Sequence, residues 1–191
     1  GTVSVGGIAP NFKAMTPDGK EFSLYDLRGH VVLLDFWASW CGPCMAEMPN
    51  VKEIYKKYHD KGLEILGVSL DSKKELWVNA IEKNELTWYH VSTLNKFDCP
   101  IAGLFRVTGI PRMYILDKDG IYHFIECNPR FSAGCEFACM NGYDCVENHI
   151  KCFMGQEIED YHFKHNMIIA RKYEEYITAT NIDVPYGKTW N

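Results

Sequence analysis

The segment from Val31 to Trp37 constrains the fold of this 191-residue chain more than any other feature. It is a continuous apolar run rich in β-branched and aromatic residues, interrupted only by Asp35, and this pattern is typical of a central strand buried on both faces. From Pro43 to His59, apolar residues recur at the spacing of one helix face. Cys41 and Cys44 therefore stand where a buried strand passes into a helix, an arrangement that indicates an α/β fold.

Strand-like and helix-like segments alternate along the rest of the first 126 residues. Together with a turn-rich N-terminal pattern, this order predicts a central mixed sheet flanked by helices and preceded by a β-hairpin. Ser72 and Glu75 have the spacing of a capping box and predict the start of one helix. The segments that we expect are a hairpin at 10–22, strands at 63–70, 88–91, 112–116 and 121–124, and helices at 72–84 and 100–106.

The pattern changes after Glu126. Residues 127–155 are punctuated by cysteine and glycine without clear periodicity, and a helical stripe of apolar residues follows at about 157–179. We therefore divide the chain into an α/β domain at 1–126 and a cysteine-rich, mainly helical C-terminal extension at 127–191. We expect the extension to pack on the same domain.

Six of the eight cysteines lie outside the Cys41 and Cys44 pair. In an oxidising compartment they could form disulfides, whose pairing the sequence does not define. A metal site is the alternative, since several of them and His149 have ligand chemistry, but their spacing matches no standard zinc motif and we assign no metal ligand. The six residues are Cys99, Cys127, Cys135, Cys139, Cys145 and Cys152.

The amino-acid composition argues against some classes of binding partner. The chain carries 20 Lys and Arg against 25 Asp and Glu, a net charge of −5, and its basic residues are dispersed, which argues against nucleic-acid binding. No apolar stretch approaches the ~18 residues that a membrane span needs. The chain starts at Gly1 without a basic and apolar leader, so we expect any signal or membrane tether to lie outside this sequence.

The spacing of Cys41 and Cys44 predicts redox chemistry. A thiol at a helix N-terminus is stabilised as thiolate by the helix dipole and by unpaired N–H groups, and a second cysteine three residues on can close a disulfide with it. Pro43 suits the first helical turn because its missing N–H would be unpaired there. We expect Cys41 to be exposed and Cys44 buried. A zinc site, the alternative for two such cysteines, would need two further ligands from distant segments.

Burying the carboxyl group of Asp35 inside an apolar strand costs free energy, so we expect it to have a hydrogen-bond partner or a function. Desolvation should raise its pKa, which would suit it to accept the proton of the Cys44 thiol through a water molecule. The alternative is a structural acid held by hydrogen bonds.

The tripeptide Gly109-Ile110-Pro111 immediately precedes a predicted strand. A cis bond before Pro111 would leave the N–H and C=O groups of Ile110 available to an extended peptide. From the sequence pattern alone, an ordinary trans proline is the more common arrangement.

These motifs together resemble the thioredoxin superfamily. The resemblance rests on the run from Asp35 to Cys44, which reads Asp-Phe-Trp-Ala-Ser-Trp-Cys-Gly-Pro-Cys, and on Gly109-Ile110-Pro111 before a β-hairpin. The N-terminal Ala9-Pro10-Asn11-Phe12 and the extra helix after Ser72 make the chain similar to the TlpA/ResA-like branch, over about residues 7–126.

The resemblance implies a role for each matching residue. Cys41 would attack a substrate disulfide, Cys44 would resolve the mixed disulfide, and Asp35 would be the buried acid. The substrate would dock against Trp40 and against Ile110 and Pro111, with Pro111 in the cis form. The spacer residues, Gly42 and Pro43, also lie at this surface and are similar to those of thioredoxin, which acts as a reductant.

The resemblance also implies where and with what the protein acts. Family members are bacterial, work in the periplasm or otherwise outside the cytoplasm, and reduce protein disulfides such as those of apocytochrome c. An upstream thiol donor re-reduces them. No cofactor is implied beyond the redox-active disulfide itself.

Two positions depart from the family pattern. Arg112 stands where thioredoxins commonly carry threonine, and Gly67 stands where they place a basic residue near the buried acid. A thiol peroxidase of the peroxiredoxin type remains an alternative, although Ser39 and Trp40 precede Cys41 where that family needs a different motif. The other alternative is a redox-inert binding module, which the presence of both cysteines disfavours.

Overall fold

The structure is built on a seven-stranded mixed sheet with the strand order β2-β1-β5-β4-β3-β6-β7. The computed structural model describes residues 7–127, 147–148, 150–151 and 154–157. The helix expected at 157–179, His149 and four of the cysteines of the predicted extension lie outside the described residues. The strands are β1 (Lys13–Met15), β2 (Glu21–Ser23), β3 (Val31–Trp37), β4 (Leu63–Ser69), β5 (Tyr89–Ser92), β6 (Arg112–Leu116) and β7 (Tyr122–Cys127). The helices are η1 (Leu24–Leu27), α1 (Gly42–Tyr58), η2 (His59–Lys61), α2 (Lys74–Lys83), η3 (Lys96–Asp98) and α3 (Pro100–Leu104), where η marks a 3-10 helix.

Strands β3 and β4 form the centre of the sheet, and all seven residues of each are buried. β3 pairs in parallel with β4 and antiparallel with β6, and β5 is parallel to β4. The hairpin of β1 and β2 joins antiparallel to β5, while β7 closes the other edge antiparallel to β6. The predicted mixed sheet with an N-terminal hairpin is therefore confirmed.

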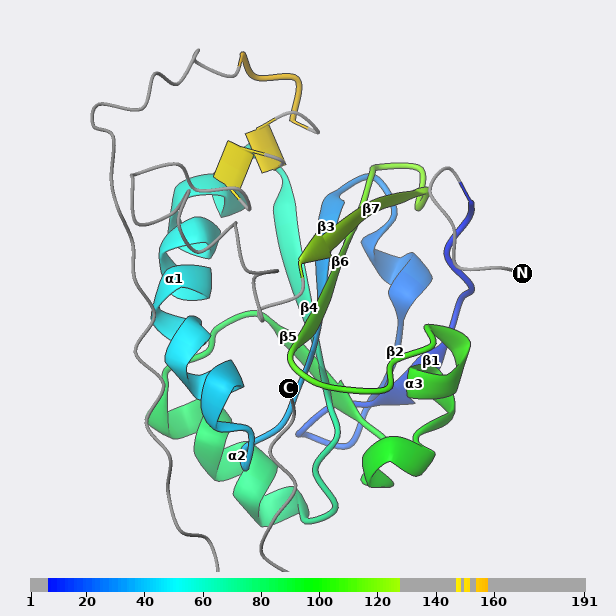
Figure 1. The fold of residues 1–191 in the computed structure, drawn as a ribbon, viewed down its shortest axis with the longest axis vertical. Helices are drawn as coiled ribbons and strands as arrows, with labels where there is room; N and C mark the ends of the chain where they lie inside the picture. The colour runs from blue at the N-terminus through cyan, green and yellow to red at the C-terminus, as the bar shows by residue number, and fades with distance from the viewer. Residues whose placement is uncertain (1–6, 128–146, 149, 152–153, 158–191) are drawn as a thin grey trace, which may run out of the picture.

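Different helices cover the two faces of the sheet. Figure 1 shows α1 and α2 on one side of the sheet and α3 on the other. On the α3 side, the ring of Phe36 lies 5.5 Å from that of Phe105 and 6.0 Å from that of Tyr114. Because side chains alternate along a strand, the neighbours of Phe36, Asp35 and Trp37, point to the opposite face, which α1 covers. The sheet thus presents Asp35 to the helix that carries the cysteine pair.

The two helix starts differ in their caps. Ser23 and Asp26 form a capping box at η1. The predicted cap at Ser72 is wrong, because α2 begins at Lys74 after an extended residue without a side-chain cap. The preceding Asp71 is buried and turned toward the end of β3, and the chain stays extended beyond it.

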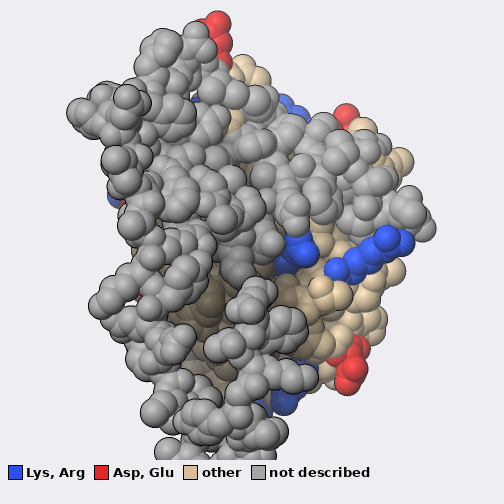
Figure 2. Space-filling model, in the orientation of Figure 1, with Lys and Arg blue, Asp and Glu red and all other residues tan. Residues whose placement is uncertain are grey.

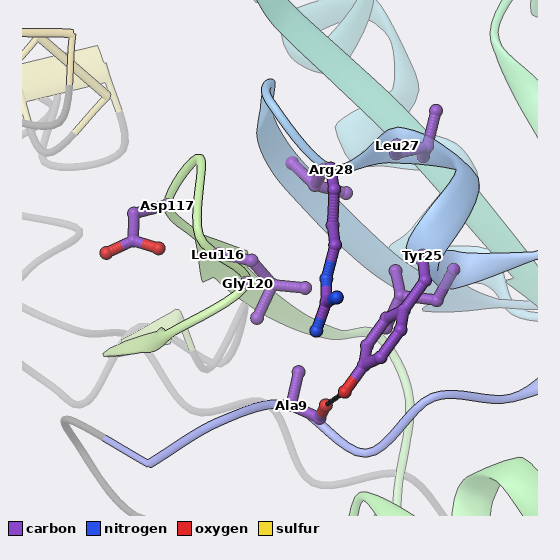
Figure 3. Close-up of a pocket in the computed structure, with 9 residues that line it drawn as sticks. Ala9, Tyr25, Leu27, Arg28, Leu116, Asp117 and Gly120 are labelled. Atoms are coloured by element: carbon purple, nitrogen blue, oxygen red, sulfur yellow. Dashed lines mark hydrogen bonds between the residues drawn. The ribbon is translucent and has the colours of Figure 1, made fainter.

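The N-terminal segment is fixed at the end of the sheet where β3 begins, around the small hollow of Figure 3. The hydroxyl of Tyr25 donates to the carbonyl oxygen of Ala9 at 2.9 Å, and the Arg28 guanidinium lies 3.6 Å from the centroid of the Tyr25 ring. The amide of Ala9 donates to the Gly120 carbonyl at 2.9 Å. Since Cys41 follows the other end of β3, this hollow is not part of the cysteine site.

On the face shown in Figure 2, the Lys and Arg side chains that can be seen lie at several separate places. No helix in the described part of the chain is long and apolar enough to cross a bilayer. Within the same residues, no three His, Cys, Asp or Glu side chains are grouped to hold a metal ion.

Candidate redox site

Cys41 and Cys44 form a disulfide at the N-terminal end of α1. Cys41 is the N-cap residue, and its Sγ accepts a hydrogen bond from the backbone N–H of Cys44 at 3.2 Å. Gly42 and Pro43 lie exposed between the two, with Pro43 in the first helical turn as predicted. In the reduced protein the same N–H and the helix dipole would favour a thiolate on Cys41.

The exposure of Cys41 differs from the sequence-based expectation. The side chain is 5% exposed, against 2% for Cys44, so both cysteines are buried in the disulfide form. The reason is local, because the sulfur of Cys41 is bonded to Cys44 and faces the helix amide.

Asp35 is a buried acid without a hydrogen-bond partner among the described residues. It is 1% exposed, and neither carboxyl oxygen makes a hydrogen bond there. Burial, and secondarily the negative charge of Glu47, raises the pKa of Asp35 to about 7. A carboxyl group of this kind exchanges a proton readily at neutral pH. The alternative of a structural acid held by hydrogen bonds finds no support in these contacts.

The strand register explains the departure at Gly67. Asp35 is paired with Gly67 on β4, and Gly67 is paired with His90 on β5. A Cβ atom at position 67 would lie 2.8 Å from His90 Nδ1 and 2.9 Å from Trp37 Nε1. The imidazole and the indole thus fill the space that a side chain at residue 67 would need.

His90 is the residue of this site that sequence reasoning missed. It is 5% exposed, and its ring lies 5.8 Å from that of Trp37. Burial lowers the pKa of His90 to about 4, and the Leu86 backbone offsets this only in part, so the imidazole is neutral at pH 7. One sequence signal could have indicated that His90 is buried. Residues alternate between the two faces along an extended segment, and this alternation places His90 on the same face as Trp88.

The residues predicted to bind substrate meet at the end of β3 that leads to Cys41. Trp40 is 52% exposed beside the disulfide. The Ile110–Pro111 bond is cis, and β6 begins directly after it with Arg112 in register with Phe36 near the end of β3. Both Ile110 and Pro111 are half-buried. The backbone before β6 therefore lies at the same sheet end as the cysteine pair.

Hydrogen bonds to Asp71, which follows β4, fix the turn that carries Trp40. The carboxylate of Asp71 accepts hydrogen bonds from the Ser39 backbone N–H at 2.9 Å, from the Ser39 hydroxyl at 2.6 Å and from the Ser69 hydroxyl at 2.8 Å. Asp71 is itself 1% exposed. The two hydrogen bonds from Ser39 hold the segment before Cys41 in place, and the one from Ser69 ties Asp71 to the end of β4.

Comparison with known proteins places this geometry in a family. A family model described as thioredoxin-like matches residues 29–122. The thioredoxin domain of a thiol-disulfide oxidoreductase from Bacteroides vulgatus has a similar structure, with a TM-score of 0.59 and 30% identity over 63% of this chain and 86% of that chain. The chain belongs to the thioredoxin superfamily. A thiol:disulfide interchange protein from a Bacteroides species also resembles this thioredoxin-like chain, with a TM-score of 0.63 and 28% identity over 85% of this chain and 98% of that one.

Two curated relatives are also similar to this thioredoxin-like chain. The thiol-disulfide oxidoreductase ResA of Bacillus cereus is 36% identical over 118 residues, and that of Geobacillus thermodenitrificans is also 36% identical over 118 residues. Each match covers 62% of this chain and 66% of the relative, so the chain spans slightly under two thirds of the length of these relatives.

Proposed function

We propose that the protein is a protein thiol-disulfide oxidoreductase that acts through the Cys41–Cys44 pair. The observation that carries the proposal is the disulfide at the N-terminus of α1, together with the buried carboxyl group of Asp35 on the face of β3 that α1 covers. The family supports the same activity. Since the dithiol form of the pair carries the two electrons that reduce a disulfide, the proposed reaction needs no further cofactor.

The reaction begins from the reduced protein. The Cys41 thiolate attacks one sulfur of a substrate disulfide, the substrate S–S bond breaks, and the released substrate thiolate takes a proton from solvent. Asp35, as carboxylate, then accepts the Cys44 proton through a water molecule. The Cys44 thiolate attacks Cys41 Sγ and expels the second substrate thiolate, which leaves the substrate reduced by two electrons and the protein in the disulfide form.

Substrate would dock on both sides of Cys41. Trp40, Gly42 and Pro43 offer exposed surface around the disulfide. On the other side, Ile110 and Pro111 present the backbone that leads into β6, where an extended peptide can pair.

In the cell, the protein would act as a reductant of disulfides in proteins outside the cytoplasm, with cytochrome c maturation as one such setting. The Gly42-Pro43 spacer supports this direction because thioredoxin, with a low potential, has the same two residues. An upstream thiol donor would restore the dithiol.

Reduction of a peptide disulfide by the dithiol form tests the proposal. Wild type should reduce the peptide, Cys41→Ser should be inactive, and Cys44→Ser should accumulate a mixed disulfide that mass spectrometry detects. Cys99→Ser is the control, because Cys99 is a buried free thiol and should be dispensable. Full activity in Cys41→Ser would refute the proposal. Turnover of hydrogen peroxide without peptide reduction would favour a thiol peroxidase instead.

A further inference from the structure

An exposed apolar hollow lies beside the cysteine pair on the side away from Pro111. It has a volume of about 350 Å³ and is formed where the turn after β3, the start of α2 and η3 come together. We call it the α2–η3 groove. Its three apolar residues, Trp40, Leu76 and Phe97, are 52%, 51% and 45% exposed. Exposed apolar surface of this kind typically marks a site of contact with another molecule. The lining consists of Trp40, Asp71, Ser72, Lys73, Leu76, Lys96 and Phe97.

The accessible charge of the α2–η3 groove is positive, although the chain as a whole carries −5. Its one acid, Asp71, is buried and already bound to Ser39 and Ser69. Lys73 and Lys96 are exposed, and neither makes an ion pair with another described residue. Two exposed cations beside apolar side chains complement an acidic and apolar partner.

The segment that contributes Lys96 and Phe97 is held in an unusual backbone conformation. Leu94 has a φ of +59° and Lys96 has a φ of +52°, in the left-handed region that costs a non-glycine residue free energy. The Ser92 hydroxyl accepts a hydrogen bond from the Leu94 N–H at 3.0 Å and so fixes the turn. Such strained residues cluster at binding sites. The ring of Phe97 lies 6.3 Å from that of Trp40, which joins the segment to the redox turn.

We propose that the α2–η3 groove selects substrate proteins in which the reacting cysteine is followed or preceded closely by apolar and acidic side chains. The inference rests on the proposed function and names its substrate class. Trp40 lines the groove and directly precedes Cys41, so a substrate residue two or three positions from the attacked cysteine, about 7–10 Å away along an extended chain, reaches it. Its apolar side chain would pack on Trp40, Leu76 and Phe97, and its carboxylate would lie between Lys73 and Lys96.

The test compares two synthetic peptides of equal length that carry the same disulfide. One has Phe and two Glu near the cysteine, and the other has Phe and two Lys. We expect wild type to reduce the acidic peptide with a kcat/KM about five- to tenfold higher at low salt, as two partly exposed ion pairs would give. The difference should shrink at 0.5 M salt because exposed charges are then screened, the Debye length falling to roughly 4 Å.

A charge swap makes the test specific to the groove. The double variant Lys73→Glu/Lys96→Glu should prefer the basic peptide, whereas Lys74→Glu/Lys118→Glu, with the same change in net charge at exposed positions outside the lining, should keep the wild-type preference. Equal kcat/KM of wild type for both peptides would overturn the proposal, and so would an unchanged preference in the swapped variant. Reduction of a small uncharged disulfide by wild type separates these outcomes from failure of the proposed function, since that failure would remove this activity too.

Discussion

Asp35 and His90 flank Gly67 in one row of the sheet, two strands apart on the face that α1 covers. Both are almost fully buried, and in the described part of the chain neither carboxyl oxygen of Asp35 has a hydrogen-bond partner. Burial acts on them in opposite directions, since it disfavours the charged form of each. The acid therefore holds its proton to higher pH and the base loses its proton at lower pH.

The first prediction concerns proton transfer by Asp35. With a pKa of about 7, this carboxyl group is part ionised at neutral pH, and Asp35→Asn removes the acceptor for the Cys44 proton. We expect resolution of the mixed disulfide to slow by about 100-fold or more near pH 7, as for loss of a general base. Stopped-flow measurement of this step between pH 5 and 9 checks it. An unchanged rate and pH profile would exclude the role, and Glu64→Gln, a change at another buried acid, serves as control.

The second prediction concerns stability against pH. The folded state keeps a proton on Asp35 between its unfolded value near 3.8 and about 7, so this residue makes stability fall as pH rises through that window. His90 stays neutral in the folded protein down to about pH 4, while the unfolded state takes up a proton near 6.5, so this residue makes stability fall as pH drops. Between pH 4 and 6.5 the two contributions oppose each other.

Single variants separate these contributions. From pH 4.5 to 7, the free energy of unfolding of Asp35→Asn should rise relative to wild type by on the order of 3 kcal/mol. That of His90→Gln should fall relative to wild type over pH 4.5 to 6.5 by on the order of 3 kcal/mol. Urea unfolding of the disulfide form at several pH values measures both. Parallel pH curves for all three proteins would contradict the assignment.

The third prediction concerns Gly67. A methyl group there would overlap His90 Nδ1 and Trp37 Nε1, so Gly67→Ala should destabilise the protein by about 1–3 kcal/mol through overpacking. Gly103→Ala on α3 is the matched control, because a Cβ atom at that position meets nothing within 4 Å. The control should be neutral or stabilising by up to about 1 kcal/mol in a helix. Equal stability of the two variants in urea would show that the crowding is absent.

The fourth prediction concerns Asp71. Asp71→Asn replaces an acceptor of three hydrogen bonds by a group that accepts at one atom and donates at the other, which leaves buried donors unpaired. We expect a loss of about 1–3 kcal/mol in unfolding free energy. We also expect slower attack by Cys41, because the turn before it loosens. Asp119→Asn on an exposed turn is the control. An attack rate equal to that of wild type would show that the turn is held by other contacts.

Local patterns predicted the parts of the fold that local residues determine. The apolar run of β3 and the periodicity of α1 identify a strand and a helix within one or two residues of their ends. The cysteine spacing locates the reactive pair because its chemistry depends on adjacent backbone. The helix start predicted at Ser72 was wrong because a capping pattern does not show that the preceding residue, Asp71, is buried.

Features that depend on distant segments were not predictable in this way. His90 looks like any histidine in an alternating strand, and only the pairing of β3, β4 and β5 places it in line with Asp35. The α2–η3 groove likewise combines residues from three segments that are separate in the sequence. The resemblance to thioredoxins located Gly67 as a departure, but the side chains that occupy its space come from β3 and β5.

Because it accepts a hydrogen bond from the Cys44 amide, Cys41 Sγ is both one half of the disulfide and the cap of α1. In the proposed reaction the atom that exchanges electrons is also the cap that starts α1, and reduction to the thiolate would turn that cap from a neutral disulfide sulfur into an anion that accepts from the same N–H more strongly. Helix initiation and redox state are thus thermodynamically linked. The solvent exchange rate of the Cys44 amide hydrogen becomes an internal reporter of which form the protein is in.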